Sequence, residues 1–378
     1  MAENFDIIVI GLGAIGSGTV YQIARRGHRV LGIDQFRPPH VYGSSHGHTR
    51  VIRQAYHDDS RYVPYILRSY DAWRDLETSV GTDLLINTGI VLIGPPGSEI
   101  VEGARRSADE HGISYEILDR DAIQKRWPAL HVDDDACGCW EPTGGILRVE
   151  ECIHALLGAA EKSGATLRFV EPVKSWSASD QGVTVQTGSG TYTAAKLVVA
   201  AGPWCTQLLT DLNLPLWVER QVQLWFETTS MSDAFAPDRC PIASWHHGAN
   251  SNFYAFPDLG HGVKVAHHHD GRPTNPEAVG RDVDDDDIAS IREMLRRFLP
   301  NANGRLRAHD VCMYTNTPDL HFLIDFHPDS KNVVIAGGFS GHGFKFAPVV
   351  GESVAQLLSG EATDSVLSMF RLDRFQRQ

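Results

Sequence analysis

The chain carries the glycine fingerprint Gly11-Leu12-Gly13-Ala14-Ile15-Gly16 directly after the apolar run Asp6 to Ile10. We predict a strand at that run, a helix from Ser17 to Arg26, and a second strand from Arg29 to Asp34. These glycines permit a tight turn and close backbone approach to a pyrophosphate, whose charge the helix N-terminus stabilises. Asp34 is placed to bond a ribose hydroxyl. The pattern therefore predicts a Rossmann-type unit that binds a dinucleotide, and it leaves NAD, NADP and FAD open.

The overall composition excludes several classes of partner. The net charge of the 378 residues is −13, and Lys and Arg are scattered, which argues against nucleic acid and anionic membranes. No apolar run approaches the roughly 18 residues of a spanning helix. The six cysteines lack even spacing, so we expect reduced thiols, and Cys137-Gly138-Cys139 lacks the second pair of a zinc site. The C-terminus has no peroxisomal tripeptide, and we expect a cytoplasmic protein.

The order of predicted elements indicates an α/β chain with two domains, each assembled from separate segments. Residues 1–80, 146–216 and 307–378 alternate strands with helices, which predicts the dinucleotide domain. Residues 81–145 and 217–306 are richer in strands and aromatic residues, which predicts a substrate domain. Within this second domain, Asp287 is expected to cap a helix that begins near Ile288. Other elements are predicted at 61–77 and 150–163 (helices) and at 84–92, 166–170, 182–187, 196–201 and 332–336 (strands).

The segment from Gly43 to Arg53 joins small, permissive residues to two arginines three positions apart. Such a loop can follow a cofactor and still present guanidinium groups to an anion. The rigid fork of arginine matches a carboxylate in two-point contact, so Arg50 and Arg53 are candidates for anion binding. A solvated surface pair explains these arginines equally well.

Lys264 lies in the apolar run Gly262 to Ala266. A lysine within a buried strand is costly unless it has a partner or a chemical task. An edge-strand lysine facing water is the alternative, and the strand alone does not decide. The adjacent His267, His268 and His269 would point alternately to opposite faces, so they cannot converge on one ion. We predict no metal site and expect one histidine to face a site.

Two further segments favour a flavin. Cys312 is a thiol in a chain with a dinucleotide fingerprint, and a cysteine against the ring system would select a flavin and tether it covalently. Gly338 to Lys345 repeats the pattern of strand, glycine turn and helix. Backbone amides at that helix start could stabilise negative charge on a reduced isoalloxazine, and Lys345 would add a cation.

Taken together, these segments resemble the monomeric sarcosine oxidase family, which also contains N-methyltryptophan oxidase and pipecolate oxidase. The resemblance covers nearly the whole chain. It rests on the fingerprint, the Gly43 to Arg53 loop, Tyr62-Val63-Pro64 with Leu67-Arg68, the Lys264 segment, Cys312-Met313-Tyr314-Thr315, Phe322-Leu323-Ile324-Asp325, and Phe339 to Phe346.

The resemblance implies a fold like that of glutathione reductase and D-amino-acid oxidase, with an FAD-binding domain and a substrate domain. It implies FAD joined to Cys312 by a thioether at the 8-methyl group, and Lys264 beside the flavin face where dioxygen is reduced. Arg53 and Lys345 would bind the substrate carboxylate. The remaining implied residues are Arg50 and His46 lining the flavin, His268, Tyr254 and Tyr314 in the pocket, and Gly11, Gly13, Ala14, Ile15, Gly16, Asp34, Ser44, Gly338, Gly341 and Gly343 at the cofactor.

The implied activity is oxidation of a secondary amino acid, such as sarcosine, an N-methyl amino acid or a cyclic imino acid. The imine would hydrolyse, and dioxygen would be reduced to hydrogen peroxide by a monomeric enzyme. An amine dehydrogenase with another electron acceptor and a flavoprotein without turnover are the alternatives. Ser45 and His48 depart from the family's loop, and Ile242 to Asn252 matches no member we can specify. The sequence therefore predicts the cofactor chemistry but not the particular amine.

Overall fold

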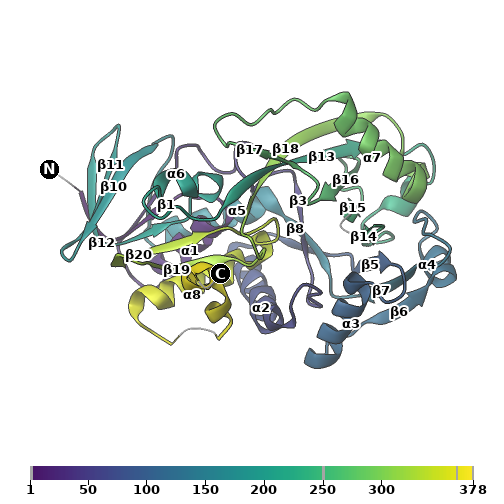
Figure 1. The fold of residues 1–378 in the computed structure, drawn as a ribbon, viewed down its shortest axis with the longest axis horizontal. Helices are drawn as coiled ribbons and strands as arrows, with labels where there is room; N and C mark the ends of the chain where they lie inside the picture. The colour runs from purple at the N-terminus through teal and green to yellow at the C-terminus, as the bar shows by residue number, and fades with distance from the viewer. Residues whose placement is uncertain (1–2, 249–251, 363–364, 377–378) are drawn as a thin grey trace.

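The computed structural model describes residues 3–248, 252–362 and 365–376. Two large sheets lie side by side in it, with a small third sheet between them (Figure 1). The first, eight-stranded sheet contains β1 (Glu3–Ile10), β2 (Val30–Ile33), β9 (Thr166–Arg168), β10 (Val173–Ser179), β11 (Gly182–Thr187), β12 (Thr191–Val199), β19 (Leu323–His327) and β20 (Ser330–Gly337). The third contains β3 (Thr49–Ile52), β4 (Leu85–Asn87) and β8 (Gly145–Arg148).

The centre of the first sheet is parallel. β1 pairs in parallel with β2 and β12, and β12 with β20, so the carboxyl ends of these strands meet at one edge. Side chains alternate along β1: Ile7 and Val9 join the core formed with the helices, whereas Ile8 and Ile10 join a second core on the opposite face. This arrangement confirms the predicted Rossmann-type unit.

Four helices pack together on the Ile7 face of the first sheet. α1 (Ala14–Ala24) contacts both α5 (Val149–Lys162) and α8 (Ala347–Ser359), and α8 also contacts α2 (Val63–Val80). A Cβ at Gly18 of α1 would lie 2.3 Å from the carbonyl oxygen of Ala347. The close approach of α1 to α8 therefore requires glycine at that position.

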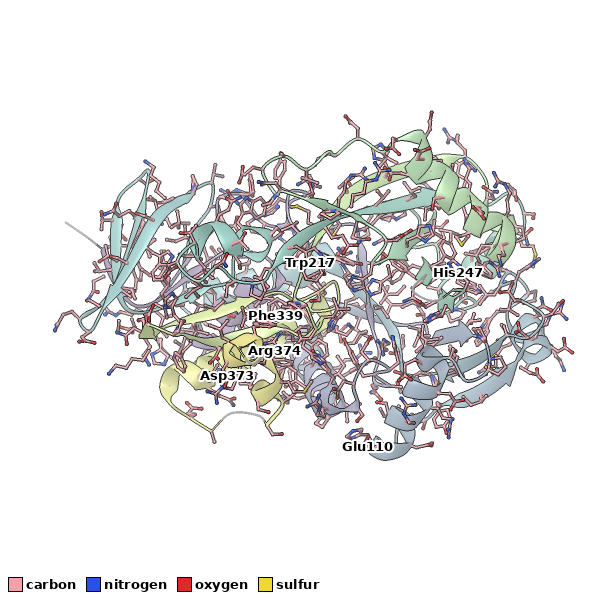
Figure 2. All side chains as sticks on the ribbon, viewed as in Figure 1. Glu110, Trp217, His247, Phe339, Asp373 and Arg374 are labelled. Atoms are coloured by element: carbon pink, nitrogen blue, oxygen red, sulfur yellow. The ribbon has the colours of Figure 1, made fainter. Side chains whose placement is uncertain are left out.

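The second, nine-stranded sheet contains β5 (Ile90–Gly94), β6 (Glu116–Asp119), β7 (Cys137–Glu141), β13 (Trp217–Phe226), β14 (Ile242–His246), β15 (Asn252–Phe256), β16 (Val263–His268), β17 (Arg272–Thr274) and β18 (Leu306–Asn316). Three helices accompany it: α3 (Glu99–His111), α4 (Arg120–Arg126) and α7 (Asp285–Phe298); the short α6 (Cys205–Leu208) follows β12. Side chains fill the space between the elements (Figure 2).

β18 pairs along its length with β13. Residues 306–316 thus belong to this sheet, although the predicted limits assign 307 onward to the cofactor domain; those limits stay a prediction.

Several local predictions can be compared with the structure. The strand at Gly182–Thr187 is confirmed with the predicted limits. The predicted cap of α7 is wrong by three residues: Asp284 is the N-cap, and Asp287 is the third helical residue that completes its capping box. The strand-like runs predicted at 84–92 are confirmed as β4 and the start of β5, which are separated by a turn at Gly89, where φ is +69°. Within the described ranges, no helix has the length and apolar character to cross a membrane.

Candidate active site

A cavity of about 420 Å³ lies at the carboxyl ends of β1, β2 and β12. Open parallel sheets bind ligands at this edge, where the strand order reverses. Phe339, on the loop after β20, also lines the cavity and lies near the middle of the molecule (Figure 2). Of the residues predicted from the sequence, the cavity is lined by Gly11, Gly13, Ala14, Ile15, Asp34, Ser44, Arg50, Tyr314, Gly338, Gly341 and Gly343.

The fingerprint forms a turn that suits a pyrophosphate. Gly11 has φ +88°, and a Cβ there would lie 2.5 Å from the carbonyl oxygen of Ala200. Gly13 is the N-cap of α1 and supplies no side-chain cap; the Ala14 amide donates to Ser45 Oγ at 3.2 Å, and the helix start faces the cavity, where its positive end suits an anion. The Asp34 carboxylate accepts the amides of Leu12 at 2.7 Å and Phe36 at 2.8 Å and still faces the cavity. A carboxylate retains acceptor capacity after two such bonds, so these residues fit a dinucleotide with its ribose at Asp34.

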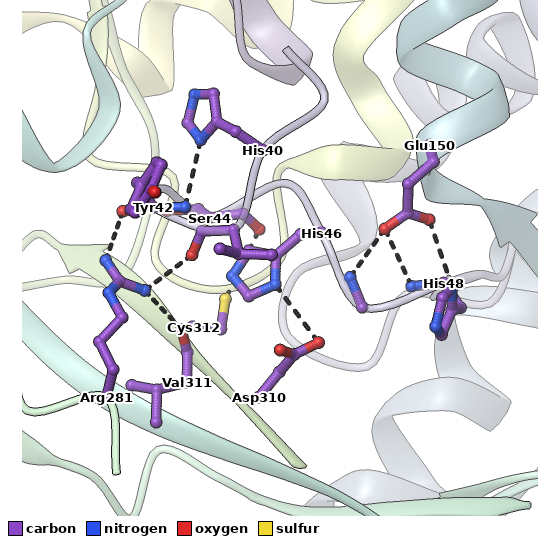
Figure 3. Close-up of polar contacts among 12 residues, drawn as sticks. His40, Tyr42, Ser44, His46, His48, Glu150, Arg281, Asp310, Val311 and Cys312 are labelled. Carbon is purple, nitrogen blue, oxygen red and sulfur yellow. Dashed lines mark hydrogen bonds and ion pairs between the residues drawn. The ribbon is translucent and has the colours of Figure 1, made fainter. Parts of the chain in front are cut away.

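Cys312 lies directly behind the cavity wall. Its Sγ is 3.5 Å from the carbonyl oxygen of Ser44 (Figure 3). It is also 3.5 Å from Nη2 of Arg50, which itself donates to that carbonyl at 2.8 Å. Ser44, Arg50 and the neighbouring Met313 all line the cavity. The predicted cysteine, arginine and loop therefore converge, although the cysteine itself is only 1% exposed.

Lys264 is buried within the second sheet, because β16 lies between β13 and β15. The alternative of an edge-strand lysine facing water is therefore wrong. Its Nζ donates to the carbonyl oxygens of Gly47 at 2.7 Å and Thr49 at 3.1 Å, and to Thr49 Oγ1 at 3.2 Å. Burial, and then Arg50, lower the pKa of Lys264 well below its ordinary value, whereas the three oxygen acceptors favour the ammonium form. His46 is also buried, with Nδ1 3.7 Å from Asp310.

Arg53 and Lys345 meet around one aromatic ring. Both are buried, so the alternative of a solvated Arg53 is wrong. The Arg53 guanidinium lies 4.3 Å from the centre of the Tyr56 ring, and Lys345 Nζ lies 5.3 Å from it. Asp58 pairs with Arg53 at 2.9 Å, and Lys345 donates to the carbonyl oxygen of His342 at 2.7 Å. Two buried cations around one ring have the charge to bind a carboxylate, and the Asp58 carboxylate already pairs with one of them.

The predicted pocket residues His268, Tyr254 and Tyr314 also lie together. His268 Nδ1 is 3.1 Å from the hydroxyl of Tyr314, and the rings of His268 and Tyr254 are 6.5 Å apart. Burial lowers the pKa of His268 well below its usual range, which keeps the imidazole neutral, and raises the pKa of Tyr254 to about 12. His267 points away and contacts Ser290, as predicted. The prediction is wrong for His268 and His269, whose rings lie 4.3 Å apart and both contact Tyr314, because β16 ends at His268 and φ of His269 is +57°.

One group outside these sites has the side chains of a metal ligand set. Asp211, His327 and Asp329 could place their ligand atoms within 4.8 Å of one another. Nε2 of His327 already contacts the Asp211 carboxylate, and Nδ1 accepts the amide of Asp329. Both ring nitrogens are therefore engaged, and we assign no metal to this group.

Comparison with known proteins places these features in a family. The profile of the FAD dependent oxidoreductases, named DAO, matches residues 6–357. The chain belongs to this family. It is 40% identical to a monomeric sarcosine oxidase of Streptomyces avermitilis over 374 residues, covering 98% of this chain and 97% of the relative. It is 35% identical to an N-methyl-L-tryptophan oxidase of Salmonella typhimurium over 376 residues, covering 98% and 99%.

A solved structure agrees with the sequence relatives. NikD, described as an unusual amino acid oxidase essential for nikkomycin biosynthesis, superposes with a TM-score of 0.85 at 25% identity, covering 98% of each chain. These findings confirm the resemblance and the α/β fold, with its Rossmann-type FAD-binding part. The protein is thus an FAD-dependent oxidoreductase of the DAO family. The glycine fingerprint alone left NAD, NADP and FAD as possible dinucleotides, and the family match selects FAD.

Several residues of the site of this DAO family member were not predicted. Tyr56, Asp58 and His342 surround the two cations, and Glu150 accepts the amides of Gly47 and His48 at 3.0 and 3.3 Å. The first three have a sequence signal, because each lies within five residues of Arg53 or Lys345. Glu150 has none, since it opens a helix far along the chain. The Ile242 to Asn252 stretch lies partly outside the described residues.

Proposed function

We propose that this enzyme oxidises secondary amino acids, such as sarcosine, other N-methyl amino acids or cyclic imino acids, with dioxygen as electron acceptor. The observation that carries the proposal is the pair of buried cations, Arg53 and Lys345, around Tyr56 in an FAD-dependent fold. Such a pair selects substrates with a carboxylate. The relatives named for sarcosine and N-methyl-L-tryptophan support an amine next to that carboxylate.

The residues that would hold FAD follow from the cavity. The fingerprint turn would bind the pyrophosphate, Asp34 the ribose, and the turn containing Gly338, Gly341 and Gly343 the flavin end. We further propose that Cys312 carries the flavin through a thioether at the 8-methyl group. Support comes from its position behind Ser44 and Arg50, which both line the cavity.

When bound, FAD supplies the acceptor for the two electrons of the C–H bond and passes them to dioxygen. The chain orients the substrate, because the carboxylate displaces Asp58 from Arg53 and is held between Arg53 and Lys345. The burial that keeps His268 neutral beside Tyr314 also disfavours a positive charge on the substrate nitrogen. It therefore favours the uncharged amine, which is the form that reacts. Lys264 and Arg50 supply positive charge where negative charge develops on reduced oxygen. Of the remaining predicted residues, Tyr254 shapes this pocket and buried His46 lies beside Asp310.

A substrate series with matched controls tests the proposal. Sarcosine, N-methyl amino acids, pipecolate and proline are incubated in air, and oxygen consumption and hydrogen peroxide are measured together. We expect at least one of them to give peroxide in proportion to oxygen consumed, whereas an N-methylamine of similar size without a carboxylate gives far less. Equal rates with and without the carboxylate would contradict the role of Arg53 and Lys345. Reduction of a dye without oxygen consumption would instead favour an amine dehydrogenase.

A further inference from the structure

The segment between β17 and α7 connects the second sheet with the cofactor cavity. Glu277, in this segment, lines the cavity, and its carboxylate accepts Nε1 of Trp204 at 2.5 Å. Trp204 lines the same cavity and belongs to the turn that follows β12 of the first sheet. One point of the segment is therefore attached to the cofactor-binding side of the molecule.

Arg281 makes a second attachment of the same segment (Figure 3). Its Nη1 donates to the carbonyl oxygens of Val41 at 2.7 Å and Val311 at 3.0 Å, and its Nη2 donates to that of Tyr42 at 2.7 Å. Val41 and Tyr42 lead into the loop that carries Ser44, and Val311 immediately precedes Cys312. One guanidinium thus ties the cavity loop to the strand that carries the cysteine.

The base of the segment is fixed to the second sheet by Arg220 of β13. Its Nε donates to the carbonyl oxygen of Gly280 at 2.9 Å, and its Nη2 to that of Asp282 at 2.9 Å. The same side chain pairs with Asp287 of α7 at 2.8 Å. Because Arg220 holds the residues on both sides of Arg281, the guanidinium of Arg281 is presented in a defined position.

We propose that residues 275–281, which we call the strap, close over the cofactor cavity, and that Arg281 is a positioning residue for flavin attachment. This inference rests on the proposed binding of FAD and its link to Cys312. The Arg281 guanidinium makes three charge-assisted hydrogen bonds to residues that lie just before Ser44 and Cys312 in the chain. These bonds fix the position of Ser44 relative to Cys312. Glu277 closes the other end of the strap against Trp204. Without Arg281, only the contacts of Ser44 and Arg50 with Cys312 still join this part of the loop to the strand. The two are then held less firmly, so the cofactor escapes faster and is attached less completely.

The first test compares Arg281→Met with Arg272→Met in purified holoenzyme. Arg272 is an exposed arginine near the strap that pairs only with Asp284 among the ion pairs of the described residues. Each protein is precipitated with acid, and the flavin in the pellet is compared with that in the supernatant. We expect a substantial share of the Arg281→Met flavin in the supernatant and the wild-type distribution for Arg272→Met. A wild-type distribution for Arg281→Met would overturn the attachment role.

The second test measures FAD release in a Cys312→Ser background, where retention does not depend on the link. Free flavin fluoresces, so its recovery after dilution reports FAD release. With Arg281→Met we expect release to be about tenfold faster, because removal of a charged hydrogen-bond donor weakens retention by about that factor. Glu277→Gln should accelerate release less, and Arg281→Lys should restore part of the retention. Equal release rates in all four proteins would overturn the strap. If wild-type protein itself releases all its flavin in acid, the thioether proposal fails, and the release rates still decide the strap.

Discussion

The ammonium nitrogen of Lys264 lies 2.7 Å from the carbonyl oxygen of Gly47, across the boundary between the second sheet and the cavity loop. On the other side of this loop, the Glu150 carboxylate accepts the amides of Gly47 and His48. The loop is therefore held between a cation that binds its carbonyl groups and an anion that binds its amide groups. Because Arg50 follows directly, this arrangement fixes the position of two positive charges at once.

Replacing Lys264 with Met should slow reoxidation of the reduced flavin far more than its reduction by substrate. The reason is that methionine keeps the length of the side chain but removes the charge, and removal of one such electrostatic group costs on the order of 10²-fold or more in rate. Stopped-flow measurement of the two half-reactions checks this, with exposed Lys331→Met as control. Equal slowing of both half-reactions would contradict the assignment.

Replacing Cys312 with Ser should give a protein whose yellow colour is released by acid precipitation, with lower oxidase activity. Serine keeps the size of the side chain but cannot form the thioether. The measurement is the flavin content of pellet and supernatant, and Cys137→Ser, a half-buried cysteine on β7, is the matched control. Acid-stable flavin in Cys312→Ser would place the link elsewhere.

Replacing Arg53 with Met should raise KM for the amino acid and lower kcat/KM by roughly 10²-fold, since a two-point charged contact is lost. Asp58 loses its partner at the same time, because it pairs with Arg53 at 2.9 Å. Steady-state kinetics with sarcosine and its analogue without a carboxylate separate these effects. Arg61→Met removes an exposed arginine that pairs with Asp59 and serves as control. Loss of activity toward both compounds equally would argue against carboxylate binding.

Stability should rise with pH across the acidic range partly because of His342. Burial, and then Lys345, lower the pKa of His342 to about 3 from an ordinary 6.5. Between these two pH values the folded state therefore binds fewer protons than the unfolded state. The resulting loss of folding stability is complete below about pH 3 and has disappeared by about pH 6.5. Unfolding free energy should increase by on the order of a few kcal/mol over this window.

Denaturant titrations at a series of pH values check this expectation with His342→Asn. The variant should lose part of the pH dependence, although it also loses the contact of the His342 ring with Tyr56 and is less stable overall. Exposed His154→Asn should keep the wild-type slope. An unchanged slope in His342→Asn would show that other groups cause the pH dependence.

Local patterns predicted the elements that depend on neighbouring residues. The fingerprint and the alternation of Gly182–Thr187 specify turn and strand directly, so both were recovered. The start of α7 was misplaced because four consecutive aspartates offer the same cap, and only the reciprocal bonds of the capping box distinguish Asp284.

The assembly of the site depends on contacts that no local pattern specifies. Lys345 and Tyr56 are separated by 289 residues, and their contact follows from the packing of α2 and α8 around the first sheet. Likewise, the burial of Lys264 depends on β16 having partners on both sides. The family resemblance predicted Lys264 and Lys345, whereas the parts played by Tyr56, Asp58 and Arg281 became visible only through their contacts.

Anaerobic reduction of the bound flavin by sarcosine and related secondary amino acids tests whether the enzyme oxidises this class of substrate. At least one of them should bleach the visible flavin absorbance, and admission of air should restore the colour with formation of hydrogen peroxide. An enzyme with bound FAD that is bleached by dithionite but by none of these amino acids would contradict the proposed function.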